Sequence, residues 1–221
     1  MEDILYRILS LLLTVPTVLI ALSFHECAHA FVAYKLGDPT AKYMGRLTLN
    51  PIKHLDPIGA ICMLFCGFGW AKSVPVNMMK FKKPKIGMAI TALAGPVTNI
   101  ILGFIGCFLY AISIRILSQY RMEAFAYYVA DAWCLFAYSF GYLNIFLAIF
   151  NLIPVPPFDG SRIWGAFLSD RLYLKFISYE RYIGIGFFAI YLLDSRLNGP
   201  ISYSLSWLVN GIFNTFCSIF I

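Results

Sequence analysis

The sequence predicts an all-α polytopic membrane protein with five or six transmembrane segments and a re-entrant hairpin. Of the 221 residues, 60% are hydrophobic and only 13% are charged, whereas soluble domains are about half apolar and a quarter charged. The apolar residues also gather in uncharged runs that match the roughly 20 residues a membrane-spanning helix needs. We therefore expect residues 1–221 to form one transmembrane domain without a sizeable soluble part.

Five apolar runs are expected to cross the membrane as helices. The first has no charged residue from position 8 to position 24 and is expected to continue to Tyr34. The others are residues 86–114, 132–158, 182–193 and 198–221. The run at 182–193 is short for a span and would need additional length from the segment before it.

A shorter uncharged stretch, residues 57–71, is the expected re-entrant hairpin. It has 15 residues, three of them glycine, and basic residues flank it on both sides. A true crossing would put one basic group on the wrong side of the membrane, whereas a hairpin keeps both on one side. Backbone of this kind is tolerated in a membrane only against protein or a wet cavity. A crossing segment is the alternative.

Positive charge predicts the orientation. Nine of the seventeen Lys and Arg residues lie between positions 35 and 85, against two aspartates. Basic loops of membrane proteins face the cytoplasm, so we expect residues 35–85 inside and the N-terminus outside. Nucleic acid could also bind such a patch, but in so apolar a chain the lipid bilayer is the expected partner and nucleic acid is not.

A polar motif interrupts the first apolar run. His25, Glu26 and His29 stand in the pattern His-Glu-x-x-His. Residues four apart share one helix face, so both imidazoles can bind one cation, and Glu26 can activate a water molecule there. An ionisable group near the bilayer centre costs at least ~2.5–3.5 kcal/mol, which a bound cation would offset. The alternative is a histidine pair that lines a proton or ion path.

A catalytic zinc ion needs a third protein ligand, and Asp159 is the foremost candidate. It closes the third apolar run, after prolines at positions 154, 156 and 157 that prevent a regular helix, and before Gly160, which permits an unusual backbone. An unwound segment can aim Asp159 inward. From the residues alone, a capping role for Asp159 at a helix end on the membrane surface is an equal alternative.

Three motifs in order resemble the site-2 protease family of intramembrane zinc metalloproteases: HECAH at 25–29, ALAGPVTN at 92–99 and NLIPVPPFDG at 151–160. GRLTLNPIKHLDPIG and GWAKSVPVN further resemble the small prokaryotic branch of this family, which lacks PDZ and CBS domains. The resemblance covers residues 12–163 well and the last two helices weakly.

The resemblance implies hydrolysis of peptide bonds within or near transmembrane segments of other membrane proteins, in a prokaryotic cell membrane. It implies one Zn²⁺ per chain, with His25, His29 and Asp159 as ligands and Glu26 as the catalytic base on the cytoplasmic side. It also implies a single transmembrane metalloprotease domain. In this domain a three-helix catalytic core spans about residues 4–163, additional helices span 172–221, and a β-hairpin or loop lies near the site.

Three further polar residues are candidates for substrate binding: Asn99, Asn151 and His54. Asn99 lies within an apolar helix, where its amide needs partners. The matching asparagine of the family is thought to hold the substrate backbone, and an interhelical hydrogen bond is the alternative. The same two roles, substrate binding and an interhelical hydrogen bond, are open for Asn151. His54 is expected at the membrane interface, but it could instead reach the site and stabilise an oxyanion.

Two other function classes would use the same residues. A membrane metal or proton transporter usually carries several polar groups along its path and often has paired halves, and this chain has sparse acids and dissimilar halves. A non-catalytic scaffold that binds membrane helices would not need to retain the ligands. The sequence therefore favours the metalloprotease.

Overall fold

The computed structural model describes residues 2–59, 71–119 and 123–220. Over these residues the chain is helical, with one isolated antiparallel bridge between Leu55 and Ala71 and no strand. The prediction of an all-α fold is confirmed. The predicted hairpin falls mostly on residues 60–70, which lie outside the described residues.

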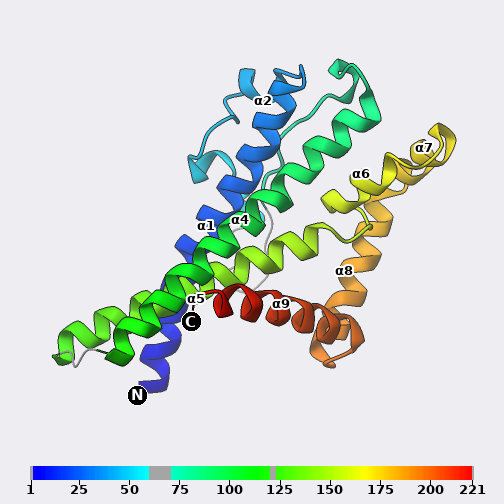
Figure 1. The fold of residues 1–221 in the computed structure, drawn as a ribbon. Helices are drawn as coiled ribbons and strands as arrows, with labels where there is room; N and C mark the ends of the chain where they lie inside the picture. The colour runs from blue at the N-terminus through cyan, green and yellow to red at the C-terminus, as the bar shows by residue number, and fades with distance from the viewer. Residues whose placement is uncertain (1, 60–70, 120–122, 221) are drawn as a thin grey trace.

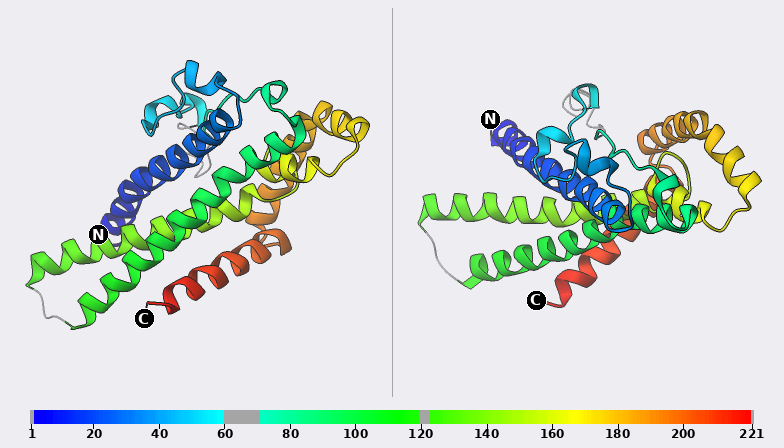
Figure 2. Two further views of the ribbon diagram at one scale, coloured as in Figure 1. Left: turned by 45° about the horizontal axis from the view of Figure 1, so that its top comes forward. Right: turned by 90° about the horizontal axis from the view of Figure 1, so that it is seen from above.

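Three long helices form the centre of the molecule: α1 (Glu2–Lys35), α4 (Pro84–Gln119) and α5 (Ala124–Asn151). Figure 1 shows α1 rising from the N-terminus, α4 running back in the opposite direction and α5 returning. The pair α4 and α5 has the most extensive contact, and α1 packs against both. The views in Figure 2 show the same three helices side by side along much of their length.

Glycine lets α4 and α5 approach closely. A Cβ atom added to Gly106 would lie 2.5 Å from the Cα of Gly141 on the facing helix. A Cβ on Gly103 would lie 2.7 Å from the side chain of Ile145. Small residues at such contacts are how membrane helices gain packing energy, because lipid gives no hydrophobic drive for helix association.

In the part of the chain that the structure describes, three helices are long and apolar enough to cross a membrane: Leu12–Lys35, Pro84–Gln119 and Ala126–Asn151. A fourth span results if α7 (Asp170–Ser178) and α8 (Glu180–Arg196), bent by 60° to one another, count as one. This is a multi-pass membrane protein, and the full count of five or six spans stays a prediction.

The third helix differs from the expected run at 132–158. It begins eight residues earlier, at Ala124, and it ends at Asn151. The early start is possible because Asp131 is exposed on the helix surface. The early end follows from the prolines, which lead into a turn and then into the short helix α6 (Asp159–Gly165).

The turn before α6 requires Gly160. A Cβ atom there would overlap the carbonyl oxygens of Leu152 and Ile153. The close approach folds α6 back onto α4, against which it packs. This fold-back brings the first residue of α6, Asp159, toward the centre of the bundle.

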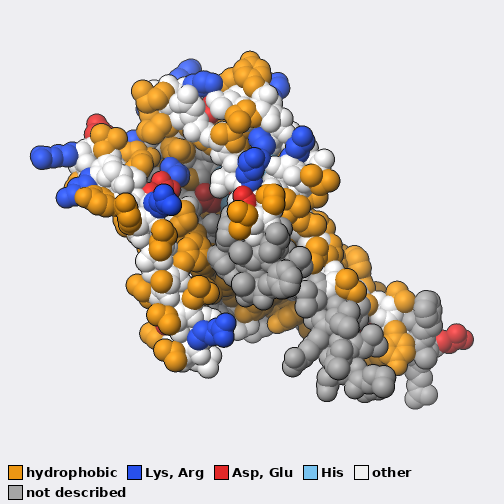
Figure 3. Space-filling model, turned by 180° about the vertical axis from the view of Figure 1, so that it is seen from behind, with side chains coloured by type: hydrophobic (Ala, Val, Ile, Leu, Met, Phe, Trp, Pro, Cys, Tyr) orange, Lys and Arg blue, Asp and Glu red, His pale blue; other side chains and the backbone are white. Residues whose placement is uncertain are grey.

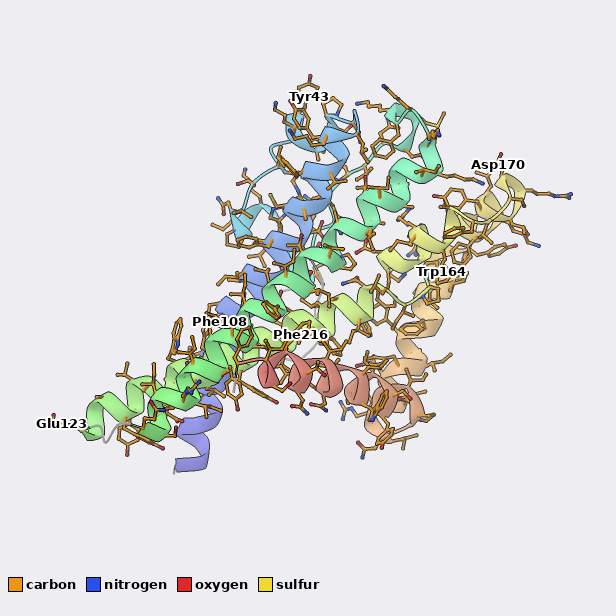
Figure 4. All side chains as sticks on the ribbon, viewed as in Figure 1. Tyr43, Phe108, Glu123, Trp164, Asp170 and Phe216 are labelled. Atoms are coloured by element: carbon orange, nitrogen blue, oxygen red, sulfur yellow. The ribbon has the colours of Figure 1, made fainter. Side chains whose placement is uncertain are left out.

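The last helix, α9 (Pro200–Ser218), packs against α5 and α4. Figure 4 shows Phe108 and Phe216 at this contact; Phe104 stacks edge-on against Phe216, with ring centroids 5.2 Å apart. The buried core here combines residues from several elements: Cys107, Ile145, Phe150, Phe158, Leu205, Val209, Phe213 and Cys217.

Segments 36–59 and 71–83 cover one end of the bundle, with α2 (Thr40–Tyr43), η1 (Pro51–Lys53) and η2 (Met78–Lys80). Buried Asp38 joins them, because its carboxylate accepts hydrogen bonds from the backbone N–H groups of Thr40 (3.0 Å) and Asn77 (2.6 Å). Burial raises the pKa of Asp38, but the hydrogen bonds from the hydroxyl group of Thr40 and from these two backbone N–H groups outweigh burial and lower the pKa below its ordinary value.

Basic side chains gather at the same end of the molecule. Figure 3 shows most of the Lys and Arg side chains of that face around segments 36–59 and 71–83 and around α7. Where their side chains are described, the long helices that extend away from this end are largely apolar on their surface. This distribution agrees with a membrane protein whose basic loops lie on one side.

Candidate metal centre

The two histidines of the motif lie on one face of α1. The Nε2 atoms of His25 and His29 are 3.0 Å apart, and the rings meet edge to face with centroids 4.6 Å apart. Both side chains are buried, with 5% and 8% of their surface exposed. The spacing of four residues in a regular helix is sufficient to produce this pairing.

Asp159 completes the cluster from the start of α6. Its Oδ2 atom lies 3.1 Å from Nε2 of His25 and 3.3 Å from Nε2 of His29. One potential ligand atom from each residue falls within 4.8 Å of the others. The structure therefore brings together the three residues that the sequence suggested as ligands, across about 130 positions of chain.

The far nitrogens of the two imidazoles are also occupied. Nδ1 of His29 lies 2.7 Å from the backbone carbonyl oxygen of Thr91, and Nδ1 of His25 lies 2.5 Å from Oδ1 of Asn99. Because a carbonyl can only accept, Nδ1 of His29 carries a hydrogen, and in the neutral imidazole that binds metal Nε2 presents a lone pair to the cluster. Such outer partners are typical of metal-binding histidines.

Gly95 on α4 makes room for both rings. A Cβ atom there would lie 2.5 Å from Cε1 of His25 and 2.5 Å from Nε2 of His29. Small residues in membrane helices commonly allow close approach of a neighbouring helix, and here the close approach is to the imidazoles of α1. Glycine is therefore required beside the cluster.

The donor set fits a zinc ion. Two imidazole nitrogens and one carboxylate oxygen are a usual protein ligand set of catalytic zinc, which keeps a fourth position for water or substrate. Oδ2 of Asp159 is buried without a hydrogen-bond partner. Electron-rich atoms that converge in this way are stable together only when a cation or a proton lies between them.

Glu26 stands next to the cluster but is held by a different segment. Its side chain is 7% exposed, and Oε2 accepts a hydrogen bond of 2.8 Å from the N–H of Val74. Val74 belongs to the stretch 71–77, which forms no regular secondary structure and which the side chain of Arg46 anchors through the carbonyls of Lys72 and Ser73. Val74 could not be recognised as a site residue from the sequence, because it contributes only its backbone N–H group.

A cavity of about 160 Å³ opens beside the cluster, lined by His29, Val76, Met88, Thr91, Ala92, Asp159 and Arg162. Arg162 donates a hydrogen bond of 2.8 Å to Glu180, which ties α6 to α8. Sequence reasoning missed Arg162, although its place one helical turn after Asp159 was a usable signal. A larger cavity of about 570 Å³ lies between α7 and α8 and includes none of these residues.

The other three candidates occupy different places. Asn99 is fully buried beside His25. Asn151 ends α5 and donates to the carbonyl of Leu147. His54 is 2% exposed and donates through Nε2 to the carbonyl of Thr48. Within the described residues, Asn99 is the one of the three with a hydrogen bond to the histidine cluster.

Comparison with known proteins agrees with this geometry. The sequence profile of Peptidase family M50 matches residues 111–192, which include Asp159. YwhC of Bacillus subtilis, named as a zinc metalloprotease, is 44% identical over 193 residues, which are 87% of this chain and 86% of that protein. MJ0611 of Methanocaldococcus jannaschii, also named as a zinc metalloprotease, is 30% identical over 72% of this chain and 74% of its own.

The zinc metalloprotease MJ0392 of the same archaeon is longer: 30% identity extends over 89% of this chain but 45% of that one. No solved structure matches the chain at a significant level. The identity to YwhC over most of both chains establishes the family. This chain therefore belongs to peptidase family M50, the site-2 proteases, and is an intramembrane zinc metalloprotease.

Proposed function

We propose that this metalloprotease binds one zinc ion per chain through His25, His29 and Asp159 and cleaves peptide bonds within or near transmembrane segments of other membrane proteins. The observation that carries the proposal is the convergence of two Nε2 atoms and Oδ2 of Asp159 within 4.8 Å. The transporter and scaffold alternatives are not favoured, because relatives across the family are named as metalloproteases.

We assign Glu26 as the catalytic base. Zinc bound in this centre supplies Lewis-acid activation of the scissile carbonyl and of the attacking water. Glu26 takes the proton of that water and later delivers it to the nitrogen of the leaving amine. The hydrogen bond from Val74 to Oε2 fixes the carboxylate, so we assign the proton transfer to Oε1.

The cavity beside Asp159 is our candidate for a substrate side-chain pocket. Its volume of about 160 Å³ suits one side chain of the substrate next to the scissile bond. Val76, Met88 and Ala92 give it apolar walls, and Arg162 offers a positive group. A substrate helix must unwind before cleavage, because its carbonyls are bonded internally. We propose that the stretch 71–77, which forms no regular secondary structure, bonds the backbone of the unwound segment.

The proposal places the active site on the cytoplasmic side of a prokaryotic cell membrane. His25 lies ten residues before Lys35, the end of α1. At ~1.5 Å per residue the centre is roughly 15 Å from that boundary, so water must reach it through protein. In this arrangement the N-terminus is outside, residues 1–221 form a single domain, and five or six segments cross the membrane.

The test is zinc content and cleavage by the purified full-length protein in detergent. We expect about one zinc ion per chain, cleavage of single-span membrane proteins near the membrane, and loss of both in Asp159→Ala. Zinc retained at full occupancy by Asp159→Ala would remove Asp159 from the ligand set. Ion transport in proteoliposomes without any cleavage would replace the protease with a transporter.

A further inference from the structure

A chain of buried hydrogen bonds runs from α5 through α4 to the cluster on α1. The Nδ2 group of Asn144 donates to the carbonyl of Phe140 at 2.9 Å, and Nδ2 of Asn99 donates to Oδ1 of Asn144 at 2.8 Å. Oδ1 of Asn99 then faces Nδ1 of His25 at 2.5 Å. Both asparagines are fully buried, with 0% of their surface exposed.

The direction of this chain is set at its far end. A backbone carbonyl can only accept, so the NH₂ group of Asn144 must face Phe140 and its oxygen must face Asn99. The NH₂ group of Asn99 therefore points to Asn144, and its oxygen points to His25. An amide oxygen is also only an acceptor, so Nδ1 of His25 carries a hydrogen, and in the neutral imidazole Nε2 is left with its lone pair.

We infer that Asn144 is a positioning residue, which acts through Asn99 to set the tautomer of His25 and so present Nε2 as a metal ligand. The inference rests on the proposed function, because it takes His25 to be a zinc ligand. Asn144 itself has no hydrogen bond to the cluster among the described residues. His29 has the same tautomer but needs no side-chain partner for it, because its Nδ1 atom bonds the backbone carbonyl of Thr91 directly.

Removal of Asn144 frees the amide of Asn99. With no acceptor for its NH₂ group, Asn99 can turn and present that group to Nδ1 of His25. The imidazole then accepts at Nδ1 and carries its hydrogen on Nε2, which blocks the ligand atom. Loss of outer-shell partners of this kind typically weakens metal binding by about 10–100-fold.

The test compares Asn144→Leu, which removes both hydrogen bonds at similar volume, with Asn144→Asp. A buried neutral carboxylic acid can accept from Asn99 through its carbonyl oxygen and donate to Phe140 through its hydroxyl, so it can replace the amide. By chelator competition we expect Asn144→Leu to weaken zinc binding about 10–100-fold and Asn144→Asp to restore most of the affinity. Ser113→Ala is the control: it removes a side-chain hydrogen bond to the carbonyl of Leu109, four residues back on α4, and we expect unchanged zinc affinity.

A double-mutant cycle tests whether Asn144 acts through Asn99. Once Asn99→Ala has removed the link to His25, Asn144→Leu should cause no further loss of zinc affinity. In metal-free protein with ¹⁵N-labelled histidine, Asn144→Leu should raise the fraction of the Nε2–H tautomer of His25. This signal does not depend on zinc or on activity, and size-exclusion profiles verify folding of each variant.

Two results would overturn the inference. If Asn144→Leu lowered zinc affinity in the Asn99→Ala background as much as in wild type, Asn144 would be a packing residue. If folded Asn144→Leu kept the wild-type tautomer of His25, Asn144 would not set that tautomer through Asn99. Either result leaves the proposed function intact as long as His25→Ala abolishes zinc binding. Full zinc binding by His25→Ala would instead contradict both the proposed function and this inference.

Discussion

The N–H group of Val74 donates a hydrogen bond of 2.8 Å to Oε2 of Glu26, although 48 positions separate the two residues. The contact joins the first transmembrane helix to the stretch 71–77. It holds the carboxylate of Glu26 in one orientation beside the histidine cluster. The effect of this contact on catalysis can be measured.

Glu26→Gln should keep zinc but lose cleavage. The amide oxygen of glutamine can still accept from Val74, and the ligands are untouched, so zinc content should match wild type. The amide cannot take a proton from water, and loss of a general base costs about 10²–10⁴-fold in rate. Metal analysis and a cleavage assay on the same preparation measure both effects. Wild-type proteolysis by Glu26→Gln would refute the role of Glu26 as the base.

Gly95→Ala should disrupt the metal centre. The new methyl group would lie 2.5 Å from atoms of both imidazoles, so α4 or the rings must move, and we expect much weaker zinc binding. Gly211→Ala is the control, because nothing lies within 4 Å of a Cβ atom there, and it should be neutral or stabilise the helix by up to about 1 kcal/mol. Zinc affinity and thermal unfolding in detergent measure the two variants. Equal zinc affinity for Gly95→Ala and wild type would show that the rings are not closely packed against α4.

Asp38→Asn should lower stability at neutral pH and have little effect in acid. The pKa of Asp38 is depressed in the folded protein, so its carboxylate stabilises the fold above the unfolded pKa of about 3.9 and loses this contribution as the pH falls through the lower folded value. At pH 7 the loss should be about 1–3 kcal/mol, as for hydrogen bonds to a charged group.

Thermal unfolding of wild type and Asp38→Asn between pH 7 and pH 3 measures this dependence. The gap between their midpoints should shrink only toward the acid end. Asp131→Asn, at an exposed position on α5, is the control and should follow wild type at every pH. A gap that stayed constant to pH 3 would mean that the carboxylate of Asp38 contributes through packing alone.

Arg162→Leu should change substrate preference. If the cavity beside Asp159 receives a substrate side chain, Arg162 favours an acidic residue there, and the variant should cleave acidic substrates about two- to fivefold more slowly, as expected for a partly exposed ion pair. Cleavage of apolar substrates should change less. Peptides that differ only at residues flanking the scissile bond provide the measurement. A uniform decrease for all substrates would point to loss of the Arg162–Glu180 tether between α6 and α8.

Local physics made part of this protein predictable from its sequence. The all-α fold follows from uncharged runs of about 20 residues, since a helix of that length spans the bilayer and satisfies its backbone hydrogen bonds within the segment itself. The pairing of His25 with His29 follows from the helical repeat. The break before Asp159 follows from prolines that cannot continue a helix. These features depend on neighbours in the chain, which is why a sequence can reveal them without a fold.

The tertiary structure decided which residues from distant segments contact one another. Asp159 could equally have capped a helix at the surface, and only the fold-back of α6 onto α4 places it beside the imidazoles. The same packing brings the amide of Asn99 beside His25 and the backbone N–H group of Val74 beside Glu26. Backbone donors and buried amide chains leave no pattern in a sequence, because their geometry exists only after helices far apart in the chain have packed.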